Sequence, residues 1–464
     1  MTSDWVDANT RLSNDKMPGM SSPQTNRPII AGCCLAIWLL SVSYAVITPP
    51  FQVPDEVAHY WRSVSLAHGH VWQVKRNGRQ GSYVPRSARD FVYLTWVETA
   101  GHPAAKVGVT RLRAAAQLPF EPEPVFRPFP ALYTPVPYLP ATLSCLVTDL
   151  VHVRALPAFY VGRVVTATAS VILIAAAMLE SGELMAMIAA LASLPMALFL
   201  FGSYSADALT IGLALYTGAL AWRVRTDEEA GTGRWTRLCI AACLLAMCKV
   251  VYAPIALLAI RPRVVFGAQR KWRQVVLLLG SVALGAVLSS IVLARQYYPL
   301  RADADPKAQI HEFEAHPFHV LSVVVRDYVA RFDDYRQQFV GSLGWIDVPL
   351  PGILTSIAFC LLLAVAATSE VSIAPAGRAF AVLLAILLCL GVSLSQYLVW
   401  TPPGKTYVEG IQGRYFLPVA LVLLLPVGAA VRSRGLALTA RALYALTAVA
   451  INVEALVILA KRYY

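Results

Sequence analysis

The sequence has little charge for its length and lacks the signatures of several protein classes. Only 14% of its 464 residues are charged and 57% are hydrophobic, while the mean hydropathy is +0.57. Soluble domains carry roughly 25% charged residues, so this composition excludes an ordinary soluble protein. The eight cysteines form no CxxC pair, which argues against a disulfide framework or a zinc site. No internal repeat or low-complexity tract is present. The composition predicts a polytopic membrane protein.

The net charge of +12 points to orientation rather than to a nucleic-acid partner. Basic residues of membrane proteins gather in cytoplasmic loops, and the chain has no basic, aromatic-interleaved patch of a nucleic-acid fold. Arg27 before an apolar run resembles a signal peptide, but the many later apolar runs favour an uncleaved first transmembrane helix. We therefore expect no nucleic acid and a cytoplasmic amino terminus.

Apolar runs define the expected spans. Runs able to cross about 30 Å of hydrocarbon occur at 28–48, 159–179, 184–203, 206–222, 274–294, 350–369, 378–399, 415–431 and 441–460. Basic residues bracket both ends of 234–263, which predicts a hairpin of two short helices turning near Lys249 to Val251. The proline- and tyrosine-rich 128–150 predicts an interfacial helix. If it spanned instead, the cluster around Arg223 would be exported.

This layout predicts an all-α polytopic membrane protein with about eleven transmembrane helices. Residues 1–27 form a cytoplasmic disordered tail, and 28–464 form a single transmembrane domain. Two large extracytoplasmic loops, 49–158 and 295–349, carry interfacial helices and all eight histidines. The polar chemistry is therefore expected on the outer face of the membrane.

The stretch "VPDEVAHYWR" follows the first apolar run and places two acids where membrane meets water. Pro54 suits the first position of a helix, and acids in a first turn offset the helix dipole, so Asp55 and Glu56 have a purely structural interpretation. The alternative is catalytic, because Asp55, His59 and Arg62 are spaced by four and three and share one helix face. Burial would raise the acid's pKa and Arg62 would lower it; the sequence leaves the balance open.

Other charged residues fall at expected outer turns. Asp207 begins the run at 206–222 as a helix-start acid or as a ligand for a metal or an acceptor hydroxyl. Lys249 is the only charge within the hairpin, where it is either functional or extended to the interface. Two arginines open later spans and either anchor helices or meet a lipid phosphate. The residues in question are Arg163 and Arg414, the latter with Gln412 and Tyr415 nearby.

Metal chemistry has weak support in the sequence. The histidine-rich "HGH" and "HEFEAHPFH" stretches lack HExxH or comparable ligand spacing,. No cofactor is certain. Magnesium or manganese held by Asp55 or Glu56 and Asp207 stays open as an alternative, because hard cations prefer carboxylate oxygens.

Several motifs occur in the order of a known family. They are "PPFQVPDEVAHYWRS", "FYVGR", "LPMALFLFGSYSADALT", "CKVVYAP", "GSLGWIDVPLP" and "QGRYFLP". Together they resemble the bacterial membrane family called domain of unknown function 2142, from about Arg27 to Tyr464. One departure is Val250, where the family resemblance leads us to expect proline after the lysine.

That family is similar to the GT-C glycosyltransferases, which take sugars from polyprenyl phosphate carriers outside the bacterial cytoplasmic membrane. The resemblance implies a GT-C-like fold, Asp55 with Glu56 as reserve at the catalytic acid position, and Asp207 as the second-turn acid. Substrate or phosphate contacts are then expected from His59, Arg62, Arg163, Asp207, Lys249, Gln412, Arg414 and Tyr415.

The expected function is inverting glycosyl transfer from a polyprenyl-phosphate-linked donor to a cell-envelope glycan or lipid. The expected partners are that donor, the acceptor and membrane lipid. A transporter or flippase of lipid-linked glycans is the alternative from another class, although inverted repeats are undetected and the polar residues gather at one face. A non-catalytic partner in envelope-polysaccharide assembly is the third alternative.

Overall fold

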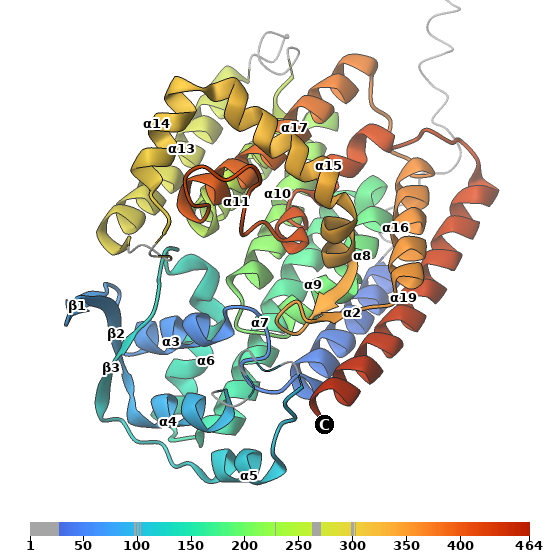
Figure 1. Ribbon diagram of the computed structural model, residues 1–464. Coiled ribbons are helices and arrows are strands. Elements are labelled where there is room, and N and C mark those ends of the chain that lie inside the picture. Colours follow the sequence, from blue (N-terminus) through green and yellow to red (C-terminus); the bar gives the residue numbers. More distant parts are fainter. Residues whose placement is uncertain are drawn as a thin grey trace, which may run out of the picture.

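The computed structural model shows a mostly helical membrane protein (Figure 1). It describes residues 27–96, 99, 102, 104–227, 229–261, 271–297, 301 and 303–464, so the predicted tail at 1–27 lies outside the described residues except for Arg27. Within these residues, five helices are long and apolar enough to cross a membrane: α2 (Arg27–Ile47), α7 (Ala155–Glu180), α13 (Trp272–Gln296), α17 (Pro375–Val399) and α19 (Arg434–Tyr463). The chain is therefore a multi-pass membrane protein.

The prediction of about eleven spans is wrong by this measure. The described residues give five spanning helices, or six if α8 (Met185–Ala192), preceded by η2 (Gly182–Leu184), and α9 (Pro195–Phe201) form one span bent by 81°. The other apolar runs make elements that are short or polar: α10 (Ala206–Thr226), α11 (Thr232–Cys248), η3 (Val250–Ala259), α16 (Gly352–Ala367), η4 (Gly413–Phe416), α18 (Ala420–Leu424) and η5 (Leu425–Val427). Apolar length in a sequence is therefore not helix length in the structure.

The reasons differ between these elements. The 10-residue η3 is a 3₁₀ helix with Pro254 inside it, and α18 has only 5 residues between two 3₁₀ turns. Helix α10 has 21 residues but carries Asp207, Arg223 and Arg225. Most of its residues are buried, and broken or polar backbone is tolerated at membrane depth where protein rather than lipid surrounds it. The expected hairpin is present, because α11 ends at Cys248 and η3 begins at Val250.

The segment between α2 and α7, called the first loop, is not all-α as predicted. Its helices are α3 (Glu56–Ala67), α4 (Arg86–Thr95), α5 (Val109–Gln117), η1 (Val136–Tyr138) and α6 (Leu139–Leu150). They accompany an antiparallel sheet of β1 (Val74–Arg76), β2 (Arg79–Pro85) and β3 (Pro124–Pro128) in the order β1-β2-β3. Asn77 and Gly78 both have positive φ, as a tight two-residue hairpin turn requires.

Helix α6 has the form expected of an interfacial helix. Its outward side exposes a row of large apolar residues at helical spacing: Leu139, Leu143, Leu146, Val147 and Leu150. The opposite side buries Ala141, Ser144, Cys145 and Thr148 against the protein. An exposed apolar stripe of this kind suits the boundary between headgroups and acyl chains.

The segment between α13 and α16, called the second loop, folds back on the bundle. It contains α14 (Pro306–Ala315), α15 (Pro317–Gly341) and the two-stranded pair β4 (Ser342–Leu343) and β5 (Val348–Pro349). Figure 1 shows α14 and α15 lying across the helices rather than along them. Trp345 Nε1 donates to the Phe51 carbonyl at 3.1 Å, so the two loops meet at one end of the bundle, called here the loop face.

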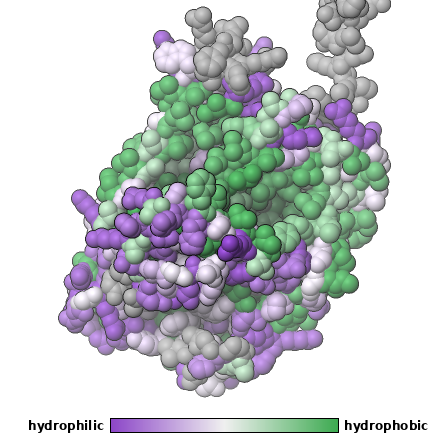
Figure 2. Space-filling model, turned by 45° about the horizontal axis from the view of Figure 1, so that its top comes forward, coloured by the Kyte–Doolittle hydropathy of each residue, from purple (hydrophilic) through white to green (hydrophobic). Residues whose placement is uncertain are grey.

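The carboxyl end of α19 also reaches the loop face. Arg462 pairs with Asp347 of the second loop at 3.1 Å and donates to the Ala105 carbonyl of the first loop at 2.8 Å. Figure 1 shows this end beside α2. Figure 2 shows hydrophobic residues over the middle of one face of the molecule. Polar residues gather mainly in the lower part of the same view. That distribution fits a bundle surrounded by lipid with its loops in water.

Candidate functional site

Four charged residues meet at the loop face, and each sits at the end of an element. Asp55 precedes α3 and Asp207 lies in the first turn of α10. Lys249 forms the extended turn between α11 and η3, and Arg414 lies in η4. These four residues, called the acid–cation cluster, come from chain segments far apart in the sequence. The starts of α3 and α10, the end of α11 and the short η4 bring them together.

Arg414 links the two acids of the acid–cation cluster. Its Nη2 lies 2.8 Å from Asp55 Oδ2, its Nη1 lies 3.5 Å from Asp207 Oδ2, and its Nε donates to Gln412 Oε1 at 2.6 Å. Lys249 Nζ lies 2.5 Å from Asp207 Oδ1. The Arg414 side chain is 3% exposed, and its Nη1 is buried without a hydrogen-bond acceptor. At 3.5 Å from Asp207 Oδ2 this nitrogen is ion-paired but makes no hydrogen bond. A buried donor gains from a hydrogen-bond acceptor, so Nη1 has the capacity to bind an oxyanion.

Asp55 does not behave as an ordinary capping acid. It occupies the N-cap position of α3 but makes no side-chain cap hydrogen bond, and its φ of 64° and ψ of 4° are left-handed. Non-glycine residues rarely adopt this region, and such strain clusters at functional sites. The side chain is 55% exposed. Its carboxylate therefore pairs with Arg414 and is otherwise accessible, and it does not cap the backbone of α3.

Charge dominates burial at Asp55. Burial among protein atoms opposes ionisation, but the charge and hydrogen bond of the Arg414 guanidinium, with His59 in its protonated form at acidic pH, outweigh it and hold the pKa of Asp55 below its ordinary value,. The opposing cation is thus Arg414 rather than the predicted Arg62. Asp55 is ionised at neutral pH, as a proton acceptor must be.

Aromatic side chains enclose the cationic side of the acid–cation cluster. Lys249 Nζ lies 5.0 Å from the ring centre of Tyr133 and 5.2 Å from that of Tyr415. Arg414 lies 5.2 Å from the Tyr415 ring. Rings at these distances stabilise a cation through their electron-rich faces, so Tyr415 contacts both cations.

His59 adds an uncharged imidazole to the site. Its Nδ1 lies 3.0 Å from the Tyr138 hydroxyl. Burial lowers the pKa of His59 to about 4, with Arg414 and Lys249 acting in the same direction and Asp55 and Asp207 against it. His59 is therefore neutral at physiological pH and able to relay or accept a hydrogen bond.

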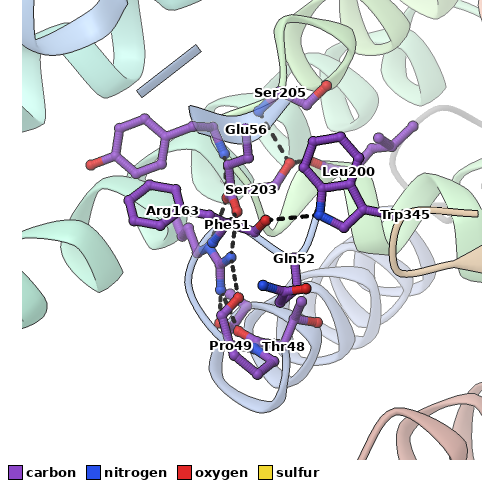
Figure 3. A network of polar contacts seen from close by, with 12 residues as sticks. Thr48, Pro49, Phe51, Gln52, Glu56, Arg163, Leu200, Ser203, Ser205 and Trp345 are labelled. Carbon is purple, nitrogen blue, oxygen red and sulfur yellow. Dashed lines mark hydrogen bonds and ion pairs between the residues drawn. The ribbon is translucent and has the colours of Figure 1, made fainter. Parts of the chain in front are cut away.

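Glu56 and Arg163 form a separate buried network (Figure 3). Both side chains are 0% exposed, and Arg163 Nη2 lies 2.6 Å from Glu56 Oε2. Arg163 donates twice to Glu56 and also to the carbonyls of Ala45, Thr48 and Pro49. Glu56 in turn accepts from the amides of Phe51 and Tyr204. The donors of Arg163 are used within the protein, so its geometry is that of a structural clamp.

Residues 38–423 match the family model of the predicted membrane protein DUF2142. The chain belongs to the DUF2142 family. All four members of the acid–cation cluster lie within the matched residues. No curated protein and no solved structure matches the chain.

In this DUF2142 protein, some of the predicted site residues come together and others do not. Asp55, Asp207, Lys249 and Arg414 are joined directly, with His59, Gln412 and Tyr415 around them. Glu56 and Arg163 belong to the buried clamp.

Arg62 lies apart from the acids that it was expected to face. It is fully buried and donates to the Val71 carbonyl at 3.0 Å. The residues that sequence reasoning missed are Tyr133 and Tyr138, whose "YTPVPY" motif indicated an interface and gave no sign of contact with Lys249 or His59.

The acid–cation cluster does not suit a divalent metal. Both oxygens of Asp207 face cations, and Arg414 lies between Asp207 and Asp55. Magnesium and manganese need several free oxygen ligands. Within the described residues, no group of three or more histidine, cysteine, aspartate or glutamate side chains is placed to hold a metal ion.

The pKa of His59 predicts a pH-dependent stability. Between an unfolded value of about 6.5 and the folded value of about 4, the unfolded chain binds a proton that the folded chain does not. Stability should therefore fall as the pH falls, by at most about 1.4 kcal/mol per pH unit. We expect thermal unfolding measured from pH 7 to pH 5 to show a smaller loss of stability in His59→Gln than in the wild type. The exposed control His311→Gln should show the wild-type loss, and equal slopes in all three proteins would contradict this assignment.

Gly413 holds Arg414 against α15. A Cβ at Gly413 would collide with backbone atoms of Tyr335 and Phe339, so Gly413→Ala should destabilise the protein by about 1–3 kcal/mol, as overpacking typically does. Gly280→Ala is the matched control, because no atom lies within 4 Å of its added methyl group. Equal melting temperatures for both variants would show that η4 and α15 are not tightly apposed.

Proposed function

We propose that this protein is a membrane glycosyltransferase. It moves a sugar from a polyprenyl-phosphate-type donor to a cell-envelope glycan or lipid on the outer face of the bacterial cytoplasmic membrane. The observation that carries the proposal is the acid–cation cluster: a half-exposed, strained carboxylate held by a buried arginine whose Nη1 is ion-paired with Asp207 but makes no hydrogen bond. The GT-C resemblance expected from the sequence motifs agrees with the proposal.

The reaction follows from the roles that these groups suit. Asp55 takes the proton of an acceptor hydroxyl, and the hydroxyl oxygen bonds to the anomeric carbon from the side opposite the phosphate. The bond from that carbon to the phosphate oxygen breaks, its electron pair stays on the phosphate, and the configuration inverts. Arg414 Nη1 and Lys249 stabilise the departing phosphate.

The charge balance of the acid–cation cluster agrees with this scheme. Asp55 and Asp207 offset Arg414 and Lys249 before the reaction. Protonation of Asp55 leaves one surplus positive charge, while the phosphate gains one negative charge on losing the sugar. The step therefore creates opposite charges close together, which a site of low dielectric stabilises.

The proposed orientation places the loop face outside the cytoplasm. Basic residues at the opposite ends of the elements support this, since Arg225 of α10 donates to the Ile260 carbonyl after η3 and Arg234 and Arg237 of α11 pair with Glu180 at the end of α7. Cytoplasmic ends of membrane helices are enriched in such residues. The start of α2 at Arg27 is then cytoplasmic, which agrees with the cytoplasmic amino terminus that we expect.

The test is donor consumption by the purified protein. Wild-type chain in lipid nanodiscs, given polyprenyl-phosphate-linked sugar and cell-envelope glycan, should release polyprenyl phosphate and form a glycosylated acceptor. Movement of the lipid-linked sugar across vesicles without sugar transfer would favour the flippase alternative. Neither transfer nor movement would favour a non-catalytic assembly role.

A further inference from the structure

A wide, open surface pocket of about 570 Å³, called here the cavity, lies between α15 and the turn that follows α17. It is lined by Ala330, Arg331, Trp400, Tyr407, Glu409 and Gly410. This volume lies within the range of sites for small molecules, roughly 300–1,000 Å³. None of these residues takes part in the acid–cation cluster, so the cavity needs an explanation of its own.

The polar groups of the cavity are held in place by the protein. Glu409 pairs with Lys405 at 3.0 Å and with Arg301, and its amide donates to Thr401 Oγ1 at 3.0 Å. Arg331 donates to the Val408 carbonyl at 3.1 Å and lies 3.3 Å from Asp327. Fixed polar groups lose little entropy when they bind a ligand, so the lining is preorganised.

Two backbone features shape the same cavity. Helix α15 departs from helical geometry at Arg331, which turns this residue toward Val408. Gly410 has a φ of 83°, and a Cβ there would collide with the Trp400 ring. Only glycine combines that backbone with such close approach of an indole. The kink at Arg331 and the close approach at Gly410 therefore both fix the positions of residues that line the cavity.

The chemistry of the lining fits a neutral, hydroxyl-rich ligand. Trp400 and Tyr407 offer aromatic surface, while Arg331 and Glu409 offer a donor and an acceptor,. The charges around the cavity balance, since three cations accompany three acids: Arg301, Arg331, Lys405, Asp303, Asp327 and Glu409. An anionic phosphate gains little from a balanced set, whereas a sugar presents both C–H faces and hydroxyl groups.

The cavity is also close to the acid–cation cluster along the chain. Gly410 precedes Arg414 by four residues, and a fully extended chain spans at most about 14 Å over that separation. We infer that this cavity binds a neutral sugar unit of the acceptor glycan, with the reacting hydroxyl of the same glycan at Asp55. The identification of the bound sugar as part of the acceptor rests on the proposed function. Sugar binding itself can be tested separately.

Saturation-transfer NMR on the full chain in lipid nanodiscs tests the inference. The probes are glucose, galactose, mannose, rhamnose and their disaccharides. At least one should receive saturation from the protein, and Trp400→Ala and Tyr407→Ala should each reduce that signal at least tenfold. Trp272→Ala is the matched control, because Trp272 is half-exposed at the start of α13. No signal from any probe, or an unchanged signal in both cavity variants, would overturn the inference.

Two further measurements separate this inference from the proposed function. Asp55→Asn should bind the sugar as wild type does, and inorganic phosphate should not displace it; displacement by phosphate would contradict a neutral sugar site. Sugar binding without donor consumption would refute the glycosyltransferase and leave the cavity a sugar site. Donor consumption without sugar binding would refute the cavity alone.

Discussion

Asp55→Asn is expected to lower the rate of sugar transfer about 10²–10⁴-fold, the usual loss when a general base is removed. The amide retains the shape of the carboxylate but cannot take the acceptor proton. Asp55 is half-exposed and pairs only with Arg414 among the described residues, so the fold should survive. The measurement is the initial rate of polyprenyl phosphate release by purified protein in nanodiscs.

The control for this prediction is Asp333→Asn, which changes an acid that is 88% exposed on α15. That variant should transfer sugar at the wild-type rate. Unchanged melting temperatures in both variants would tie the loss to chemistry. A wild-type rate in Asp55→Asn would exclude Asp55 as the base.

Arg163→Met is expected to destabilise the protein by about 3–5 kcal/mol, because it leaves a buried carboxylate without its cation. Glu56 would lose both of its bonds to the guanidinium, and the carbonyls of Ala45, Thr48 and Pro49 would lose their shared donor. These carbonyls close the turn after α2, which leads to Asp55. Thermal unfolding of the purified variant should show the loss directly.

Arg441→Gln is the matched control, since Arg441 pairs with the exposed Glu370 at 3.9 Å. Exposed pairs contribute about 0–1 kcal/mol, so its melting temperature should change little. If Arg163→Met unfolded at the wild-type temperature while losing activity, Arg163 would act on substrate rather than as a clamp.

The acid–cation cluster follows from the sequence to a useful degree. Asp207, Lys249 and Arg414 each begin or end an apolar run, and the basic residues at the other ends favour one shared side. The directions of the side chains could not be predicted from the sequence. Asp55 and Glu56 are adjacent, yet the left-handed backbone at Asp55 sends one carboxylate to Arg414 and the other to Arg163. No periodicity in the sequence encodes that divergence.

The fold was predicted less well, for reasons visible in particular elements. The run at 415–431, which became η4, α18 and η5, is apolar enough to span, but contacts with other protein segments replace the lipid that would enforce a long helix,. The sheet of the first loop did carry a signal, because "RNGR" contains the Asn77–Gly78 pair typical of a hairpin turn,. The predicted division at residue 28 and the GT-C-like architecture stay predictions.

A structure of the protein in nanodiscs with bound polyprenyl monophosphate, the expected product, tests the proposed site most directly. We expect the phosphate within hydrogen-bonding distance of Arg414 Nη1 and Lys249 Nζ, with Asp55 facing it across the space for a sugar. A phosphate bound away from these cations, with Arg414 still holding both Asp55 and Asp207, would contradict the proposed site.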